Sequence, residues 1–273
     1  MHSQTKYIIM KKLIVLFLMI IISACKSDPK VEKQTNTDVE TTKTEIAESS
    51  PVEITPLQHA TFIMTFGEEV IYFDPTGGKE SFEGLPKPTL VLITDIHGDH
   101  FNNETLLSLP DGFDIVAPRA VYSKMPAELQ NKTKTLDNGE SIKFHNFKID
   151  GIPMYNITEE RQKFHEKGRG NGYVVSQDGF RVYVSGDTED IPEMRSLKDI
   201  DLAFICMNLP YTMTPEAAAN ATLEFQPKTV IPYHYRGLKN GETHYYDVEK
   251  FKAIVNEKNK DIVVDLMEWY PEK

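Results

Sequence analysis

Four side chains that can bind metal ions lie close together in the run LITDIHGDHFN, at Asp95, His97, Asp99 and His100. Imidazole and carboxylate groups at these spacings, on a loop that follows a buried strand, can converge on two cations a few ångströms apart. The alternative is a solvated polar loop, because His and Asp are also common in turns.

Two further residues favour the metal site over the polar loop. Asp187 lies in VSGDT and His234 lies in PYHY, and each follows a run with the composition of a strand. Polar side chains that gather at the ends of strands are a frequent arrangement in catalytic sites. We therefore expect Asp187 and His234 to join the first cluster.

The first half of the domain is predicted to be rich in strands. VEIT, ATFIMTF and EEVIYFDP predict an antiparallel meander that begins at Val52. The continuous apolar run from Thr89 to Thr94 is typical of a strand buried on both faces, and the metal-like cluster begins where it ends. Helical patterns follow near Glu104 to Ser108 and over Ala120 to Asn131, and strands return around Ser141 to Pro153.

The second half repeats this pattern. GYVVSQDGFRVYVSGD predicts a hairpin with QDG as its turn, and DLAFICMN and TVIPYHY predict strands. TPEAAANATLEF predicts a helix with a Thr cap followed by Pro215. A helix from Asp247 to Asn256 and the strand DIVVDLM close the domain. Two such halves predict an α/β fold, an αββα sandwich of two facing sheets with helices outside.

The motifs resemble those of a known family. The run from Asp95 to His100 resembles the H-x-H-x-D-H signature of the metallo-β-lactamase superfamily, with Asp in the first position. VSGDT and PYHY fall in the order and approximate spacing of that family's bridging Asp and last His. HATF, YFDP, SGDTED and MNLPYTMTPEAA are most similar to the branch that holds the ascorbate-6-phosphate lactonase and the N-acyl-phosphatidylethanolamine phospholipase D. The resemblance extends from about Glu53 to the C-terminus.

The resemblance implies two divalent metal ions that activate a bridging water for hydrolysis. By this resemblance the ligands are Asp95 and His97 for the first ion, Asp99, His100 and His234 for the second, and Asp187 between the two. Asp99 and Asp187 would be the catalytic carboxylates, since Asp99 could also orient the nucleophile or move its proton.

The first ion is where the sequence departs from the family. A third histidine is expected between the two halves, and Tyr155 and Asn156 stand at the corresponding place. His165 is the nearby imidazole, and it is either a ligand, a substrate contact or a surface histidine. Because Asp95 replaces an imidazole, we expect a weaker first site that takes Mn or Fe(II) where an all-imidazole site would take Zn.

Several residues just beyond the predicted strands are candidates for contact with substrate. Tyr211, Tyr235, Arg236 and Arg169 are possible substrate-binding residues, and the two arginines could hold a phosphate or a carboxylate.

Three other residues are predicted to have mainly structural roles. Asp74, before Pro75, is expected to be a turn residue. His59 is either a support for the ligands or a core or turn histidine, and Cys206 is expected to be a small buried hydrophobic residue.

The N-terminal segment predicts export. The stretch from Met10 to Cys25 contains two lysines, a short apolar run and ISAC, which resembles a bacterial lipobox ending at Cys25. We expect Met10 to be the true start and Cys25 to be lipidated, which would anchor the protein to a bacterial membrane. An uncleaved membrane anchor is the alternative. Residues 26–51 are predicted to be a disordered tether, and residues 52–273 the hydrolase domain.

Composition restricts the class of partner. The formal net charge of -11 argues against a nucleic-acid partner, because phosphate backbones are bound mainly through Lys and Arg. We expect a small-molecule substrate, such as an ester, a lactone or a phosphodiester, and the oligomeric state remains open. The alternatives are a non-catalytic metal- or ligand-binding module and a phospholipase-like activity on membrane lipids.

Overall fold

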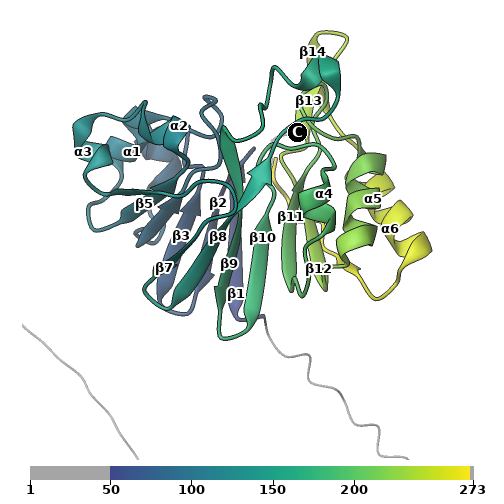
Figure 1. Ribbon diagram of the computed structural model, residues 1–273, viewed down its shortest axis with the longest axis horizontal. Helices are drawn as coiled ribbons and strands as arrows, with labels where there is room; N and C mark the ends of the chain where they lie inside the picture. The colour runs from purple at the N-terminus through teal and green to yellow at the C-terminus, as the bar shows by residue number, and fades with distance from the viewer. Residues whose placement is uncertain (1–49, 271–273) are drawn as a thin grey trace, which may run out of the picture. The chain divides into compact units, whose positions relative to one another are not determined.

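Two β-sheets form the centre of the domain, and helices cover their outer faces (Figure 1). The structure is a computed structural model that describes residues 50–270. The predicted signal segment and residues 26–49 of the predicted tether lie outside the described residues. The αββα sandwich predicted from the sequence is confirmed.

The first sheet has the strand order β1-β2-β3-β4-β5-β6. Its strands are β1 (Val52–Gln58), β2 (Thr61–Phe66), β3 (Glu69–Phe73), β4 (Leu90–Leu92), β5 (Asp114–Ala117) and β6 (Thr133–Thr135). The strands from β1 to β3 are antiparallel, and those from β3 to β6 are parallel. The helices α1 (Asn103–Ser108), α2 (Arg119–Tyr122) and α3 (Ala127–Gln130) lie on this side of the domain (Figure 1).

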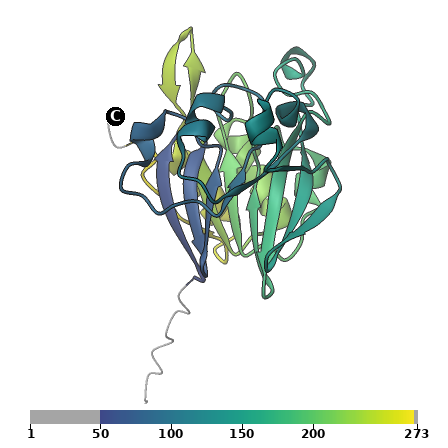
Figure 2. The same ribbon diagram turned by 90° about the vertical axis from the view of Figure 1, so that its left-hand side faces the viewer.

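The second sheet has the order β15-β12-β11-β10-β9-β8-β7. Its strands are β7 (Ser141–Phe144), β8 (Phe147–Met154), β9 (Gly170–Gln177), β10 (Phe180–Val184), β11 (Leu202–Cys206), β12 (Thr229–Tyr233) and β15 (Val263–Val264). The strands β10, β11, β12 and β15 are parallel. The helices α4 (Pro192–Arg195), α5 (Pro215–Phe225) and α6 (Val248–Lys258) cover it. A separate hairpin of β13 (Arg236–Lys239) and β14 (Glu242–Tyr245) projects beyond the sheets (Figure 2), and two 3-10 turns are η1 (Lys79–Phe82) and η2 (Glu159–Arg161).

Alternation along the strands divides the core into two layers. On β2, Phe62 and Met64 belong to the cluster between the two sheets, whereas Ile63 belongs to the cluster under α1, α2 and α3. On β4, Leu92 belongs to the cluster between the two sheets and Val91 to the cluster under the three helices. This is the period of two expected of a strand covered on both faces, so the first sheet is held from both sides.

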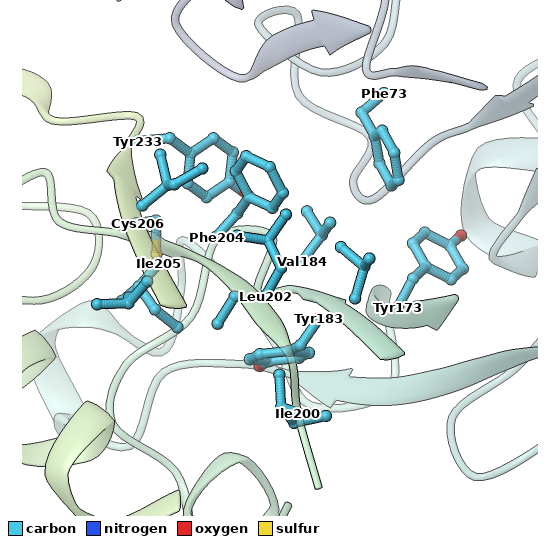
Figure 3. Packing of buried hydrophobic residues seen from close by; sticks show 14 of the residues in the cluster. Phe73, Tyr173, Tyr183, Val184, Ile200, Leu202, Phe204, Ile205, Cys206 and Tyr233 are labelled. Atoms are coloured by element: carbon cyan, nitrogen blue, oxygen red, sulfur yellow. The ribbon is translucent and has the colours of Figure 1, made fainter. Parts of the chain in front are cut away.

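Aromatic rings fill the space between the sheets (Figure 3). Phe62 of the first sheet stacks on Phe204 of the second with ring centroids 4.4 Å apart, and Trp269 packs edge-on to Phe62 at 5.6 Å. Cys206 lies on the same strand as Phe204 and is fully buried, which confirms the prediction of a buried small hydrophobic residue.

The carboxyl ends of several strands meet at one edge of the sandwich. β3, β4, β10 and β12 all end there, because β3 is parallel to β4 and β10 is parallel to β11 and β12. Loops at the carboxyl ends of parallel strands are the usual place for a site in such sheets. The cluster that follows β4 is therefore brought towards the residues that follow β10 and β12.

Most predicted elements are confirmed, two differ in extent, and several observed elements were not predicted. The single helix predicted over Ala120 to Asn131 is two short helices, because the chain breaks before Pro126, which disfavours a helical residue ahead of it. The last predicted strand is reduced to Val263–Val264. The strands β5 and β6, the helix α4 and the β13–β14 hairpin were not predicted. Within residues 50–270, none of the helices has the length and apolar character needed to cross a membrane.

Replacement of Phe204 by Ala is expected to lower the free energy of unfolding by about 3 to 5 kcal/mol, because it opens a cavity between the sheets. Denaturant unfolding of the two proteins measures this. Leu107→Ala is the control, since the Leu107 side chain is 44% exposed. A loss for Phe204→Ala as small as that of the control would show that the inter-sheet layer is not the main core.

Candidate metal centre

One group of possible ligands lies where strands of the two sheets end, and its members are Asp99, His100, Asp187 and His234. The Nε2 atoms of His100 and His234 are 3.2 Å apart. Asp187 lies 3.4 Å from His100 Nε2 and 3.3 Å from His234 Nε2. Two ligands of a tetrahedral ion at about 2.0 to 2.1 Å lie roughly 3.3 to 3.4 Å apart, so these donor atoms have the spacing of a small divalent metal.

Another group lies beside it and is formed by Asp95, His97 and His165. Asp95 Oδ2 is 2.6 Å from His97 Nδ1 and 3.9 Å from His165 Nε2. Of the two candidates for the third position, the structure thus brings His165 into the group and leaves Asn156 outside it. The group that includes Asp95 is called the first group below, and the one that includes His234 is called the second group.

Asp187 connects the two groups. Its Oδ2 lies 3.3 Å from His165 Nε2 in the first group and 3.4 Å from His100 Nε2 in the second. Its Oδ1 is buried and makes no hydrogen bond to any described residue. Because buried carboxylate oxygens normally have partners, this orphaned atom fits a cation bound between the groups.

The charges in the second group are arranged to attract a cation. Burial would lower the pKa of His100, but Asp187, Asp99 and Asp74 raise it well above its usual value. Burial would raise the pKa of Asp187, but His234 and His100 lower it well below its usual range. The negative potential that favours a proton on an imidazole here equally favours a divalent ion, so the donor set fits a metal.

His100 is held in position by Asp74, a residue that the sequence predicted only to stabilise a turn. Asp74 Oδ2 lies 2.8 Å from His100 Nδ1, and its two oxygens accept hydrogen bonds from the backbone and hydroxyl of Thr94. A carboxylate on Nδ1 leaves Nε2 free to bind a metal and fixes the direction of the ring. In the second half, the Asn208 amide contacts His234 Nδ1 at 2.9 Å.

His59 lies against the second group and supports two of its members. Its Nε2 is 3.2 Å from Asp99 Oδ2, and its ring centroid is 3.8 Å from that of His234. Its Nδ1 contacts the Tyr270 hydroxyl at 2.9 Å. Burial and the neighbouring His234 lower the pKa of His59 to about 4, so the ring is neutral near pH 7. Of the two roles considered for His59, the structure supports contact with the ligands.

The guanidinium of Arg169 forms an ion pair with the carboxylate of Asp95. Its Nε is 3.1 Å from Oδ1 of Asp95 and its Nη2 is 3.0 Å from Oδ2. Burial would raise the pKa of Asp95, but His97, His100 and Arg169 lower it below its usual value. The guanidinium that the sequence suggested for substrate is thus paired with a residue of the first group.

The other predicted residues surround the groups without joining them. The Asn156 amide donates to the backbone oxygens of Arg161 and Tyr211. Tyr211 packs against Phe164 with ring centroids 5.0 Å apart. Tyr235 is buried beside Tyr270, and the Arg236 guanidinium lies 5.4 Å from the centre of the Tyr270 ring.

The roles of Asp74, Asn208 and Tyr270 were not predicted from the sequence. Asp74 could have been found, because it follows β3, which pairs in parallel with β4 and so ends beside the metal cluster. Asn208 follows the buried strand β11 in the same way. Tyr270 follows no strand end and carries no motif, so the sequence offered no sign of its contact with His59.

Asp74→Asn is expected to weaken metal binding by about 10- to 100-fold, because the amide no longer holds the charge that orients His100. Titration of the metal-free protein with Zn²⁺ measures the change. Asp111→Asn, at an exposed loop residue, is the control. Equal affinities of the two variants would show that Asp74 does not orient the ring.

Comparisons with known proteins agree with this geometry. The family described as the beta-lactamase superfamily domain matches residues 53–234. A UPF0173 metal-dependent hydrolase of Thermococcus onnurineus (strain NA1) is 28% identical over 221 residues, which cover 78% of this chain and 96% of the relative.

Solved structures give the same result. A protein of Parabacteroides distasonis ATCC 8503, described as a metal-dependent hydrolase, is 37% identical with a TM-score of 0.69, over 80% of this chain and 94% of that chain. The metallo hydrolase Igni18 of Ignicoccus hospitalis is 24% identical with a TM-score of 0.65, over 80% and 95% of the two chains, and supports the fold alone. The family match covers more than half of the chain, and the chain belongs to the beta-lactamase superfamily, with the metallo-β-lactamase fold.

Proposed function

We propose that the protein is a metal-dependent hydrolase that acts on a small ester, lactone or phosphodiester. The observation that carries this proposal is the position of Asp187, which lies within 3.4 Å of imidazoles in both groups. Two divalent ions held there would supply Lewis acidity and lower the pKa of a bound water. The relatives named as metal-dependent hydrolases support the same reaction class.

Asp99 is the residue best placed to orient the attacking water. Its side chain is 40% exposed, whereas those of His100, His234 and Asp187 are buried. Its Oδ2 lies 3.4 Å from His234 Nε2 and 3.2 Å from His59 Nε2, which holds the carboxylate at the open side of the group. A carboxylate in this position can accept a hydrogen bond from a water or move its proton.

Arg236 is the better candidate for an anionic part of the substrate. Arg169 has both nitrogens of one edge on Asp95, whereas Arg236 lies over the ring of Tyr270. Tyr270 contacts His59, and His59 contacts Asp99, so Arg236 is connected to the metal centre through two side chains. A guanidinium there could bind a phosphate or a carboxylate, which suits the lactonase and phosphodiesterase chemistry of the branch that the motifs resemble.

A phospholipase-like activity on membrane lipids is the second candidate, because a membrane anchor would favour it. We propose that the protein is exported and anchored by a lipid on Cys25.

His234→Ala is expected to lower turnover by more than about 100-fold and to remove metal from the second group, because it deletes one of its imidazoles. Hydrolysis of bis(p-nitrophenyl) phosphate and of a simple lactone, with metal content by elemental analysis, measures both effects. His145→Ala is the matched control, since the His145 side chain is 57% exposed and pairs with Glu69.

Turnover by the parent protein is the deciding result. Stripping with a chelator should abolish it and added metal should restore it. Metal bound without any turnover would favour the non-catalytic binding module instead, and full activity of His234→Ala would contradict the two-group centre.

Cys25→Ala is expected to move the protein from the membrane fraction to the soluble fraction, because acyl chains and not a spanning helix would hold it. Cell fractionation and the mass of the mature N-terminus measure this. Retention of an uncleaved chain in the membrane would contradict the lipid anchor.

A further inference from the structure

One guanidinium occupies both oxygens of the carboxylate that replaces an imidazole in the first group. Arg169 contacts Oδ1 and Oδ2 of Asp95 at 3.1 and 3.0 Å, the two-point geometry in which Arg binds carboxylates most strongly. The side chain of Asp95 is fully buried and that of Arg169 is 16% exposed. Solvent and salt therefore screen this ion pair only weakly.

The same oxygen of Asp95 also faces the first group. Oδ2 lies 2.6 Å from His97 Nδ1, on the side where the imidazoles of His97 and His165 converge. A cation held by these imidazoles would have to share Oδ2 with Arg169. Two positive groups on one oxygen repel each other, so the ion pair lowers the attraction of Asp95 for a metal.

The backbone places Arg169 in this position. Arg169 donates a short hydrogen bond to the carbonyl oxygen of Phe164, the residue before His165. Gly170 follows, and a Cβ there would lie 2.8 Å from the carbonyl oxygen of Thr94 and 3.3 Å from Asp95 Oδ1. One loop therefore carries both a ligand of the first group and the cation that competes with the metal.

The second group has no equivalent. Among the described residues, the ion pairs of Asp99 and Asp187 are all with histidines. An imidazole can lose its proton and bind a metal, whereas the guanidinium keeps its charge at any ordinary pH. The two groups thus differ in fixed charge although they share Asp187.

We propose that Arg169 is a positioning residue that neutralises Asp95 and so makes the first group bind its ion more weakly than the second. As a pair, Asp95 and Arg169 have no net charge, like the imidazole that the family's signature has in the place of Asp95. This inference rests on the proposed metal centre. It assigns the difference between the two groups to Arg169 and not to the carboxylate alone.

The test is a titration of the metal-free protein with Zn²⁺ and with Mn²⁺, which gives two dissociation constants. His165→Ala should remove the weaker site and thereby identify it as the first group. Arg169→Gln should tighten that site by about 10- to 100-fold and leave the other unchanged, because it removes a positive charge beside the ion. It should also lower the melting temperature of the metal-free protein, because Asp95 is then buried without a counter-charge.

Two control variants separate charge from other effects. Arg169→Lys keeps the positive charge and should keep the weak first site. Lys167→Gln removes a positive charge from the same loop, where Lys167 pairs with Glu193 at 2.7 Å, and should change neither dissociation constant.

Unchanged or weaker binding at the first site of Arg169→Gln would overturn the inference. A raised KM with unchanged metal binding would also overturn it, and would assign Arg169 to the substrate. If the parent protein bound no divalent ion, the metal centre itself would be refuted, which is a different result.

Should Arg169→Gln fail to fold, a second pair of variants gives the answer. Asp95→His leaves the guanidinium unpaired beside the ion and should lose the first site, and Asp95→His with Arg169→Gln should regain it. Equal binding by these two proteins would overturn the inference.

Discussion

The buried carboxylate of Asp187 is the constraint on which the rest of the site depends. An ionised carboxylate removed from water costs several kcal/mol unless other charges or hydrogen bonds compensate for it. Three imidazoles, from His100, His165 and His234, lie within 3.4 Å of its oxygens. Gly186 precedes it with φ +60, and a Cβ there would lie 2.5 Å from Met154 Sδ. The turn after β10 therefore requires glycine at position 186, and it places the Asp187 side chain among these imidazoles.

The two sheets are arranged so that this carboxylate can be reached from both. His100 follows β4 of the first sheet, and His234 follows β12 of the second. Direct hydrogen bonds hold the sheets in place near the site. The Tyr173 hydroxyl donates to the carbonyl oxygen of Ile93 at 2.6 Å, and the backbone N–H of Asn171 donates to the carbonyl oxygen of Thr94 at 2.9 Å. The positions of the ligands thus follow from inter-sheet packing and not from the loops alone.

Features that depend on the local order of residues are predictable from the sequence, whereas features that depend on the packing between the sheets are not. The apolar run before Asp95 predicted a buried strand with polar residues at its end, and the structure has both. The pairing of Arg169 with Asp95 joins residues 74 positions apart, on loops beside strands of different sheets, so no pattern along the chain predicts it. Which of Asn156 and His165 joins the first group depends in the same way on the path of the loop after β8.

The site also depends on both ends of the described domain. His59 follows the first strand, and Tyr270 is the last described residue, yet their side chains meet at 2.9 Å beside Asp99. Tyr270 packs in turn against Tyr235 and Tyr245, which bracket the β13–β14 hairpin. Because these contacts join the beginning of the domain to its end, the support behind Asp99 forms only when the whole sandwich has folded. Four histidines and several carboxylates are held at one edge at a cost in free energy. Packing of the whole core offsets this cost, since no local segment of the chain could hold them together.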